Sequence, residues 1–208
     1  DSRPVLTGIK VEIEGDGFTF AGADGFRLAV FKGKLAQPAS ENVSFIVPAR
    51  ALLEVGRLIT GQKQPVEFTV TPSKGQALFR LENVEVVTQL IQGTFPDYSQ
   101  LIPQSYDTKV VVDLQEFLRA TRTAAIFARD GSGIVRVQVT GGTDGSPGKL
   151  SILSRAEEVG ENQGEIDANV EGDEAKIAFN SKYLADVLGV LEESEVALET
   201  TTSSSPGV

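Results

Sequence analysis

An internal repeat constrains this sequence more than any other feature. Residues 46–59 align with residues 178–191, an offset of 132 positions. In both segments the end of a strand leads into the start of a helix. A basic residue follows, then a leucine two positions later, an acidic residue four positions later and a valine five positions later. A duplication of this length predicts two copies of one domain in tandem.

The repeat extends to the strands that precede the helix. Residues 17–21 align with 149–153 at the same offset, whereas residues 9–13 align with 135–139 at an offset of 126. A longer turn at residues 141–148 of the second copy accounts for this difference.

The two copies differ in what they contain. A strand at residues 110–112 and a helix from Asp113 to about Ala128 have no counterpart in the first copy, and residues 79–98 have none in the second. We therefore expect a fragment of a longer protein, which begins inside one domain and lacks the last strands of the other.

Strands are predicted where apolar and polar residues alternate between turn signals. Together with the helices they predict an α+β fold of tandem domains, in which each antiparallel sheet carries helices on one face. The predicted strands of the first copy are residues 10–13, 18–21, 27–31, 43–47, 66–70, 77–80 and 84–90.

Three helices are predicted from their start signals. Asp113 with Glu116 three positions later is a capping-box pattern, Pro48 stands at a first helical position, and Asn180 is a typical cap. Apolar residues at helical spacing are expected to face inward. They are Leu114, Phe117, Leu118, Thr121 and Ala125 in the first of these helices, Leu52, Val55 and Ile59 in the second, and Leu184, Val187, Leu188 and Leu191 in the third.

Basic residues lie off the apolar stripes of these helices. Each is most simply an ordinary solvated position, but helices that line one surface would make that surface attractive to a polyanion. Such attraction is weak and non-specific, because phosphate contacts carry no sequence information. The basic residues are Arg50, Arg57, Arg119, Arg122 and Lys182.

The chain as a whole is acidic, with a net charge of −10. Residues 1–109 hold 11 basic and 12 acidic residues, whereas residues 110–208 hold 8 and 17. Eight of these acids lie between Glu157 and Glu174, and the alternation at residues 165–170 predicts an exposed strand with a solvated acidic surface.

Several classes of function are excluded or disfavoured. The chain has no histidine and no cysteine, which excludes disulfides, thiolate or Ser-His-Asp catalysis and histidine- or cysteine-bound metals. No apolar run reaches the length of a membrane span, and we expect a cytoplasmic protein without cofactor or metal.

No catalytic motif is found. Residues 142–149 have Pro147 where a phosphate loop needs glycine, residues 130–133 lack the carboxylates of a calcium loop, and Glu157 and Glu158 point to opposite faces of a strand. Two alternatives stay open: a hydrolase with paired carboxylates about 5 to 9.5 Å apart on a β-rich scaffold, and a duplicated interaction module that does not bind DNA.

Four segments in order resemble the bacterial DNA polymerase III beta subunit, the sliding clamp family. They are residues 3–8, residues 23–29, the Phe-Pro-Asp-Tyr sequence at 95–98 with Pro103 after it, and residues 177–184. The resemblance covers the whole chain. It implies a non-catalytic processivity factor with three domains per chain, in which two chains close head to tail around duplex DNA.

The resemblance also implies the domain limits. Residues 1–106 would be most of the middle domain without its first strand and helix, and residues 107–208 the third domain without its C-terminal strands. The family's helices line the hole and its sheets form the outer wall, so the resemblance implies that Arg3, Arg50, Arg57, Arg119, Arg122 and Lys182 face DNA.

The family binds short hydrophobic peptide motifs of polymerases, the clamp loader and repair proteins in a pocket of the middle domain. Phe26 stands where a histidine is common, and the C-terminal strand that completes the pocket is not in this chain. The resemblance places the pocket wall at Leu6, Ala23, Gly25, Phe26, Arg27, Leu28, Pro96, Gln100 and Leu101, although plain core packing would also explain the leucines. It assigns Ile126 and Phe127 to the subunit interface.

Overall fold

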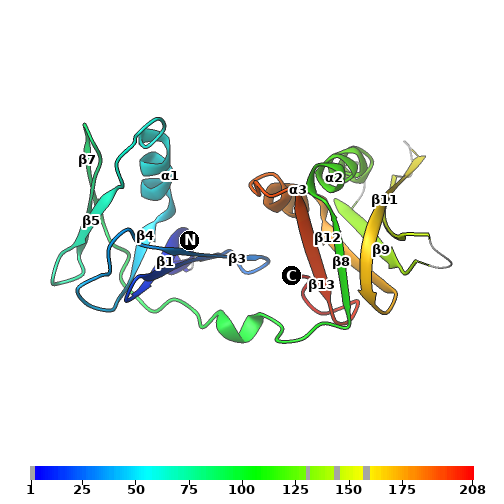
Figure 1. Cartoon of the computed structure of the whole chain (residues 1–208), viewed down its shortest axis with the longest axis horizontal. Helices are drawn as coiled ribbons and strands as arrows, with labels where there is room; N and C mark the ends of the chain where they lie inside the picture. Colours follow the sequence, from blue (N-terminus) through cyan, green and yellow to red (C-terminus); the bar gives the residue numbers. More distant parts are fainter. Residues whose placement is uncertain (1–2, 130–131, 143–145, 157–159) are drawn as a thin grey trace. The chain divides into compact units, whose positions relative to one another are not determined.

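The chain folds into two units, Asp1–Tyr98 and Ser99–Val208, and each combines antiparallel strands with helices (Figure 1). The computed structural model describes residues 3–129, 132–142, 146–156 and 160–208. Within these residues, no helix is both long enough and apolar enough to cross a membrane.

The first unit contains two antiparallel sheets. One has the strand order β3-β2-β1-β4 and the other the order β5-β6-β7. Helix α1 follows β4 directly and contacts β4 and β1. The bounds are η1 Pro4–Thr7, β1 Gly8–Glu14, β2 Gly17–Ala23, β3 Leu28–Lys34, β4 Val43–Pro48, α1 Ala49–Leu58, β5 Glu67–Val70, β6 Gln76–Arg80 and β7 Glu85–Gln89.

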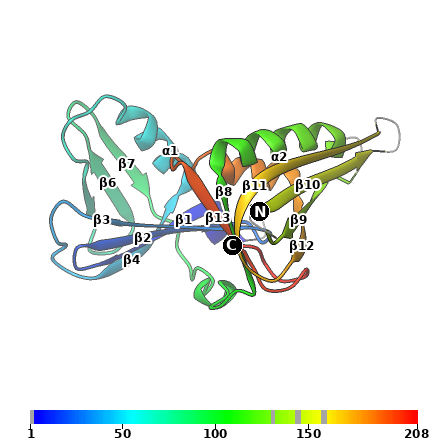
Figure 2. The same ribbon diagram turned by 45° about the vertical axis from the view of Figure 1, so that its right-hand side comes forward.

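The second unit has one six-stranded sheet, in the order β12-β9-β10-β11-β8-β13. Helix α2 lies along β9, β10 and β11 and packs beside α3 (Figure 2). The bounds are η2 Ser99–Leu101, β8 Thr108–Asp113, α2 Leu114–Arg129, β9 Ile134–Thr140, β10 Gly148–Ala156, β11 Gly160–Gly172, β12 Ala175–Asn180, α3 Ser181–Leu188 and β13 Glu195–Thr200.

The strand pairing confirms the internal repeat. Strand β1 pairs with β2 and β4, and β9 pairs in the same antiparallel way with β10 and β12. Strand β4 at residues 43–48 runs straight into α1, just as β12 at residues 175–180 runs straight into α3. The offset of 132 found in the sequence therefore relates two equivalent strand–helix junctions.

The units differ because β8 and α2 occur only in the second. Strand β8 pairs with β11 on one side and β13 on the other, which joins all six strands into one sheet. In the first unit, no described strand bridges β3 and β5, so its strands remain in two sheets.

The helix starts follow the sequence prediction with one correction. The backbone N–H of Glu116 donates to Asp113 Oδ1 at 2.8 Å, and Asn180 Oδ1 accepts from the N–H of Lys182 at 3.0 Å and of Tyr183 at 3.2 Å. Pro48 is not the first helical residue. Its ψ of 128° keeps it at the end of β4, and α1 begins at Ala49.

The cores confirm most of the predicted inward positions. Leu114 and Phe117 of α2 pack with Leu184 and Leu188 of α3 on the six-stranded sheet, and Val55 packs in the core of the first unit. The prediction was wrong for Ile59, Val187 and Leu191, which are exposed. Ile59 and Leu191 lie beyond the last residues of their helices, and α3 buries only a narrow stripe.

The predicted exposed strand at residues 165–170 is exposed on one face only. It belongs to β11, where Ile166 and Ala168 are buried while Glu165 and Asp167 point to solvent. The acidic residues Glu157 and Glu158 and parts of the two rejected loops lie outside the described residues.

Candidate functional site

A tight turn between β2 and β3 holds three of the predicted pocket residues, Gly25, Phe26 and Arg27. The carboxylate Oδ1 of Asp24 accepts the backbone N–H of Phe26 at 3.0 Å and of Arg27 at 3.1 Å, and its Oδ2 accepts Arg27 Nε at 2.9 Å. Gly25 has a φ of +91°, a left-handed conformation that glycine adopts without strain. Residues 24–27 therefore form a fixed turn and not a loose loop.

The hydrogen bonds of this turn act on the acidity of Asp24. Partial burial opposes ionisation of the carboxyl group, but the donors from Phe26 and Arg27 outweigh it and lower the pKa of Asp24. The carboxylate consequently stays charged and keeps the turn closed across the physiological pH range.

Phe26 is the most exposed large apolar side chain of this turn, with 83% of its surface accessible. Ala23 and Leu28 lie opposite each other at the end of β2 and the start of β3, and both are half-buried. Phe26 therefore displays its ring to solvent in a turn that two half-buried apolar residues, Ala23 and Leu28, flank.

The segment before β1 meets this turn and the loop after β7. A Cβ at Gly25 would lie 3.5 Å from the guanidinium of Arg3, and one at Gly93 would lie 2.8 Å from a methyl of Val5. Leu6, half-buried in η1, thus lies in a segment that contacts both the 24–27 turn and the loop that carries Pro96.

The remaining predicted pocket residues belong to the second unit. Gln100 and Leu101 form part of η2, and Leu101 is 58% exposed. Seven of the nine pocket residues therefore lie in the first unit, and two lie in the segment that follows it.

The sequence reasoning missed one polar cluster next to this region. The hydroxyl of Tyr98 donates to Glu12 Oε2 at 2.7 Å, and Lys10 Nζ lies 2.7 Å from Glu12 Oε1. Tyr98 belongs to the quoted 95–98 segment, but nothing in the sequence pairs it with residues 86 positions away.

Five of the six predicted basic residues occupy exposed positions on α1, α2 and α3, and the sixth, Arg3, is exposed just before η1. Arg57 pairs with Glu54 at 2.8 Å, and Arg119 lies 3.7 Å from Glu116, each one turn along its helix. These pairs reduce the local positive charge but do not remove it.

Two other basic residues have different neighbours. A Cβ at Gly189 would lie 3.7 Å from the guanidinium of Arg122, which places that charge at the carboxyl end of α3, where a cation is favoured. Lys182 lies in the first turn of α3. Like Arg50 and Arg122, Lys182 forms no ion pair with any residue that the structure describes.

The predicted interface residues lie near the end of α2. Ile126 is 58% exposed, and Phe127 is half-buried. Strand β11 pairs with β10 on one edge and with β8 on the other, but only its residues Asn169–Gly172 reach β8. On the β8 edge, residues 160–168 therefore have no partner strand within the described part of the chain.

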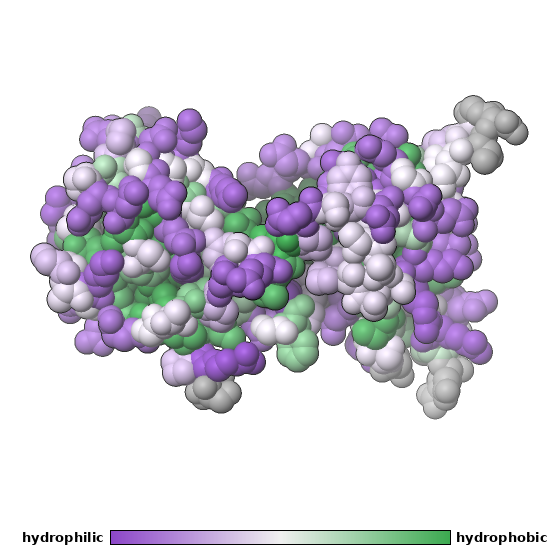
Figure 3. Space-filling model, turned by 90° about the horizontal axis from the view of Figure 1, so that it is seen from below, coloured by the Kyte–Doolittle hydropathy of each residue, from purple (hydrophilic) through white to green (hydrophobic). Residues whose placement is uncertain are grey.

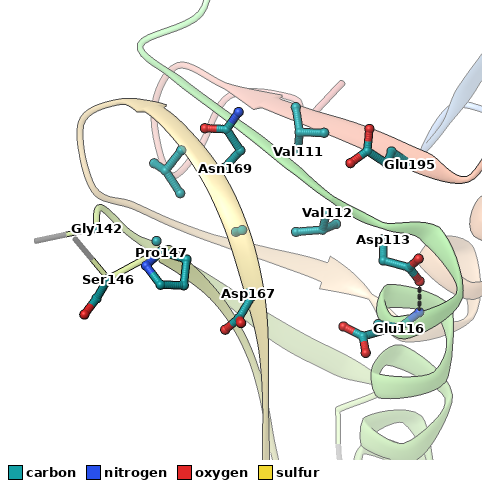
Figure 4. Close-up of a pocket in the computed structure, with 13 residues that line it drawn as sticks. Val111, Val112, Asp113, Glu116, Gly142, Ser146, Pro147, Asp167, Asn169 and Glu195 are labelled. Carbon is teal, nitrogen blue, oxygen red and sulfur yellow. Dashed lines mark hydrogen bonds between the residues drawn. The ribbon is translucent and has the colours of Figure 1, made fainter.

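A broad hollow of about 740 Å³ lies where β8, β11 and the turn before β10 diverge (Figure 4). Four carboxylates border it, those of Asp113, Glu116, Asp167 and Glu195. Asp113 accepts the N–H of Glu116, and Asp167 pairs with Lys149. Among the described residues there is no cluster of three or more metal-ligating side chains.

Exposed apolar side chains occur on both units. Figure 3, seen from below, shows green apolar atoms gathered over the first unit, while the second is mostly polar from this side. Phe31 of β3 in the first unit has 62% of its surface accessible, and Val190 in the second unit has 76%.

Comparison with known families gives a consistent result. The family model for the central domain of the DNA polymerase III beta subunit matches residues 1–97, and the model for its C-terminal domain matches residues 99–208. Together these two matches span nearly the whole chain.

Individual relatives agree with the family models. The chain is 34% identical over 200 residues to the beta sliding clamp of Staphylococcus aureus, covering 96% of this chain and 51% of that protein. It is 31% identical over 208 residues to the beta sliding clamp of Bacillus subtilis, covering 99% of this chain and 53% of that protein. The chain thus spans about half the length of these curated relatives.

Solved structures share the fold. The crystal structure of the DNA polymerase sliding clamp from Bacillus subtilis matches with a TM-score of 0.90 at 31% identity, over 100% of this chain and 53% of that one. A sliding clamp from Pseudomonas aeruginosa bound to griselimycin matches with a TM-score of 0.85 at 29% identity, over 100% and 54%.

Proposed function

The chain belongs to the DNA polymerase III beta subunit family, and on this premise we propose that it is part of a sliding clamp. In this role it acts as a non-catalytic processivity factor that encircles duplex DNA, slides along it and tethers a DNA polymerase. The proposal places the protein in the cytoplasm of a bacterium.

The observation that carries the DNA-binding proposal is the position of the basic side chains relative to the sheets. The helices of each unit bury one side and present basic residues on the other, whereas the acids of β11 point away from the core. A sliding protein needs only weak attraction to phosphates, because closure of the ring keeps it on DNA. The proposed DNA-facing residues are Arg3, Arg50, Arg57, Arg119, Arg122 and Lys182.

Salt-dependent DNA binding tests this assignment. In a full-length protein that carries this sequence, Arg50→Ala, Arg122→Ala and Lys182→Ala are each expected to reduce the salt slope of DNA binding by about 1 or less. Lys176→Ala is the matched control, since Lys176 is exposed on β12 next to the buried Ile177 and therefore lies on the opposite face. An equal reduction in the control would remove the assignment.

We propose that the pocket accepts short hydrophobic peptide motifs of the polymerase, the clamp loader and repair proteins. The fixed 24–27 turn, the exposed Phe26 ring and the half-buried Leu6 and Leu28 support this proposal. The proposed wall is Leu6, Ala23, Gly25, Phe26, Arg27, Leu28, Pro96, Gln100 and Leu101.

We propose griselimycin as a probe for this pocket. A solved structure of the Pseudomonas aeruginosa clamp is bound to griselimycin, and it matches 100% of this chain and 54% of that one. We therefore propose that a full-length protein with this sequence binds griselimycin as well.

Ring closure would use the end of α2 and the free edge of β11. The exposed Ile126, with Phe127 beside it, offers apolar contact. Residues 160–168 pair with β10 on one edge, and their other edge, which has no partner strand in the described part of the chain, can accept a further strand. A head-to-tail contact of this kind is heterologous and closes only when the subunit rotation completes a ring. We propose a homodimer for the full-length protein.

Neither alternative function gains support. A hydrolase requires a free pair of carboxylates, but in the acidic hollow Asp113 caps a helix and Asp167 pairs with Lys149. A duplicated interaction module without DNA is disfavoured, because the matching relatives and structures named above are sliding clamps.

A further inference from the structure

Tyr98, the last residue of the first unit, contacts two side chains of β1, an inner strand of the four-stranded sheet. Tyr98 donates its hydroxyl to Glu12 Oε2 at 2.7 Å, and Lys10 binds the other oxygen of Glu12 at 2.7 Å. Lys10 Nζ also lies 5.4 Å from the centroid of the Tyr98 ring, within the range of a cation–π contact. We call these three residues the Tyr98 cluster.

The cluster is built on a rigid base. Lys10 and Glu12 are two positions apart on β1 and therefore share one face of the strand. Strand β1 is held between β2 and β4, and Tyr98 makes an edge contact with the buried ring of Phe95 at 6.5 Å. The Tyr98 side chain is consequently fixed from both the strand and its own segment.

The same residue types occur at the other end of the segment between the units. Lys109 Nζ lies 5.4 Å from the centroid of the Tyr106 ring and 3.0 Å from Glu199 Oε1. Residues 99–105, which include Gln100 and Leu101, thus run between two tyrosines that are each held by a lysine–glutamate pair.

We propose that Lys10, Glu12 and Tyr98 are positioning residues that fix the path of residues 95–98 and thereby the place of Pro96 in the proposed peptide pocket. This inference rests on the proposed function, because the position of Pro96 matters for binding only if the pocket binds a ligand. Partly exposed ion pairs add little to global stability. The effect of the cluster is therefore expected in the local order of this segment.

The contacts within the cluster shift the pKa values of both Tyr98 and Glu12. Partial burial and the Glu12 carboxylate raise the pKa of Tyr98 to about 12. Burial opposes ionisation of Glu12, and so does the charge of Asp97, but the hydrogen bonds from Lys10 and Tyr98 outweigh them and lower its pKa.

The sign of each shift defines the pH window of the contact. The raised pKa of Tyr98 means that its contribution to the stability of the fold is complete below pH 10 and is lost as the pH rises towards about 12. The lowered pKa of Glu12 means that its contribution to the stability of the fold is complete above pH 4.5, the ordinary pKa of a glutamate. This contribution is lost as the pH falls through the lowered pKa. The cluster is therefore intact throughout the neutral range.

The variant Tyr98→Phe tests the proposal in a full-length protein that carries this sequence, with Tyr106→Phe as the matched control. Tyr98→Phe keeps the ring on Phe95 and removes only the hydroxyl. Tyr106→Phe also removes only the hydroxyl, and the contact between its ring and Lys109 stays. We expect Tyr98→Phe to speed amide hydrogen exchange in residues 95–98 and to raise the Kd for griselimycin about five- to tenfold, the size of the net contribution of one hydrogen bond. The control should change neither.

A spectroscopic measurement separates positioning from a general loss of stability. In Glu12→Gln the ultraviolet titration of Tyr98 should move from about 12 towards its ordinary value of 10, because the neighbouring negative charge is gone. Unchanged exchange in residues 95–98 of Tyr98→Phe would overturn the proposal, as would equal acceleration in the control. If the wild-type protein does not bind griselimycin while Tyr98→Phe still speeds exchange, the pocket assignment fails and the positioning role stands.

Discussion

At the scale of single residues, the surface around the 24–27 turn combines fixed geometry with exposed apolar groups. Asp24 holds the backbone of the turn through two N–H donors, and Gly25 permits its left-handed conformation. Leu28 begins the next strand opposite Ala23. A rigid apolar surface of this kind loses little conformational entropy when it binds a ligand.

Leu28 gives the most direct residue-scale prediction. In a full-length protein that carries this sequence, Leu28→Asp is expected to weaken griselimycin binding at least tenfold, because a charge would be buried under the ligand without a partner. Ala29→Asp adds the same charge to the next residue of β3, which points to the other face, and should leave binding unchanged. Circular dichroism checks that both variants fold. Undiminished binding by a folded Leu28→Asp protein would show that the pocket lies elsewhere.

At the scale of elements, local sequence signals predicted the strands and helices but not how distant strands pair. Alternation predicted β1 to β7 to within about three residues at each end, and Asp113 and Asn180 marked the starts of α2 and α3. The inward assignment of Ile59, Val187 and Leu191 was wrong, because helical spacing does not reveal where a helix ends or how wide a contact its neighbour makes.

The long-range contacts had no signal in the sequence. Nothing local indicates that β8 joins β11 to β13, or that the Tyr98 hydroxyl reaches Glu12 on β1. Both depend on segments that come together only in the folded chain. The resemblance to a known family supplied the proposed pocket residues, but it did not indicate that Tyr98, two positions after Pro96, is hydrogen-bonded to Glu12.

The cap of α3 gives the element-scale prediction. Asn180→Ala removes the acceptor for two backbone N–H groups at the start of the helix and should destabilise the second unit by about 1 kcal/mol. Asn169→Ala, at an exposed position of β11, is the control and should lower the free energy of unfolding by less. Urea unfolding followed by circular dichroism measures the difference. Equal stability of the two variants would mean that the cap contributes nothing.

At the scale of the whole molecule, the two units are related by duplication, and each places basic residues on exposed sides of its helices. The net charge of −10 is compatible with DNA binding if the acids lie elsewhere, as those of β11 do. Topological closure, not affinity, would then keep the protein on DNA, and a mildly attractive inner surface would let it slide.

Retention on circular DNA tests this central claim most directly. A full-length protein that carries this sequence is loaded by a clamp loader onto nicked circular duplex DNA, washed in moderate salt, and then released by cutting the circle with a nuclease. The account predicts that the protein stays on the closed circle through the wash and leaves once the circle is linearised. The 208-residue chain alone, which spans about half the length of its relatives, should wash off both forms. Loss of the full-length protein from closed circles in the wash, or its persistence on linear DNA with free ends, would contradict the account.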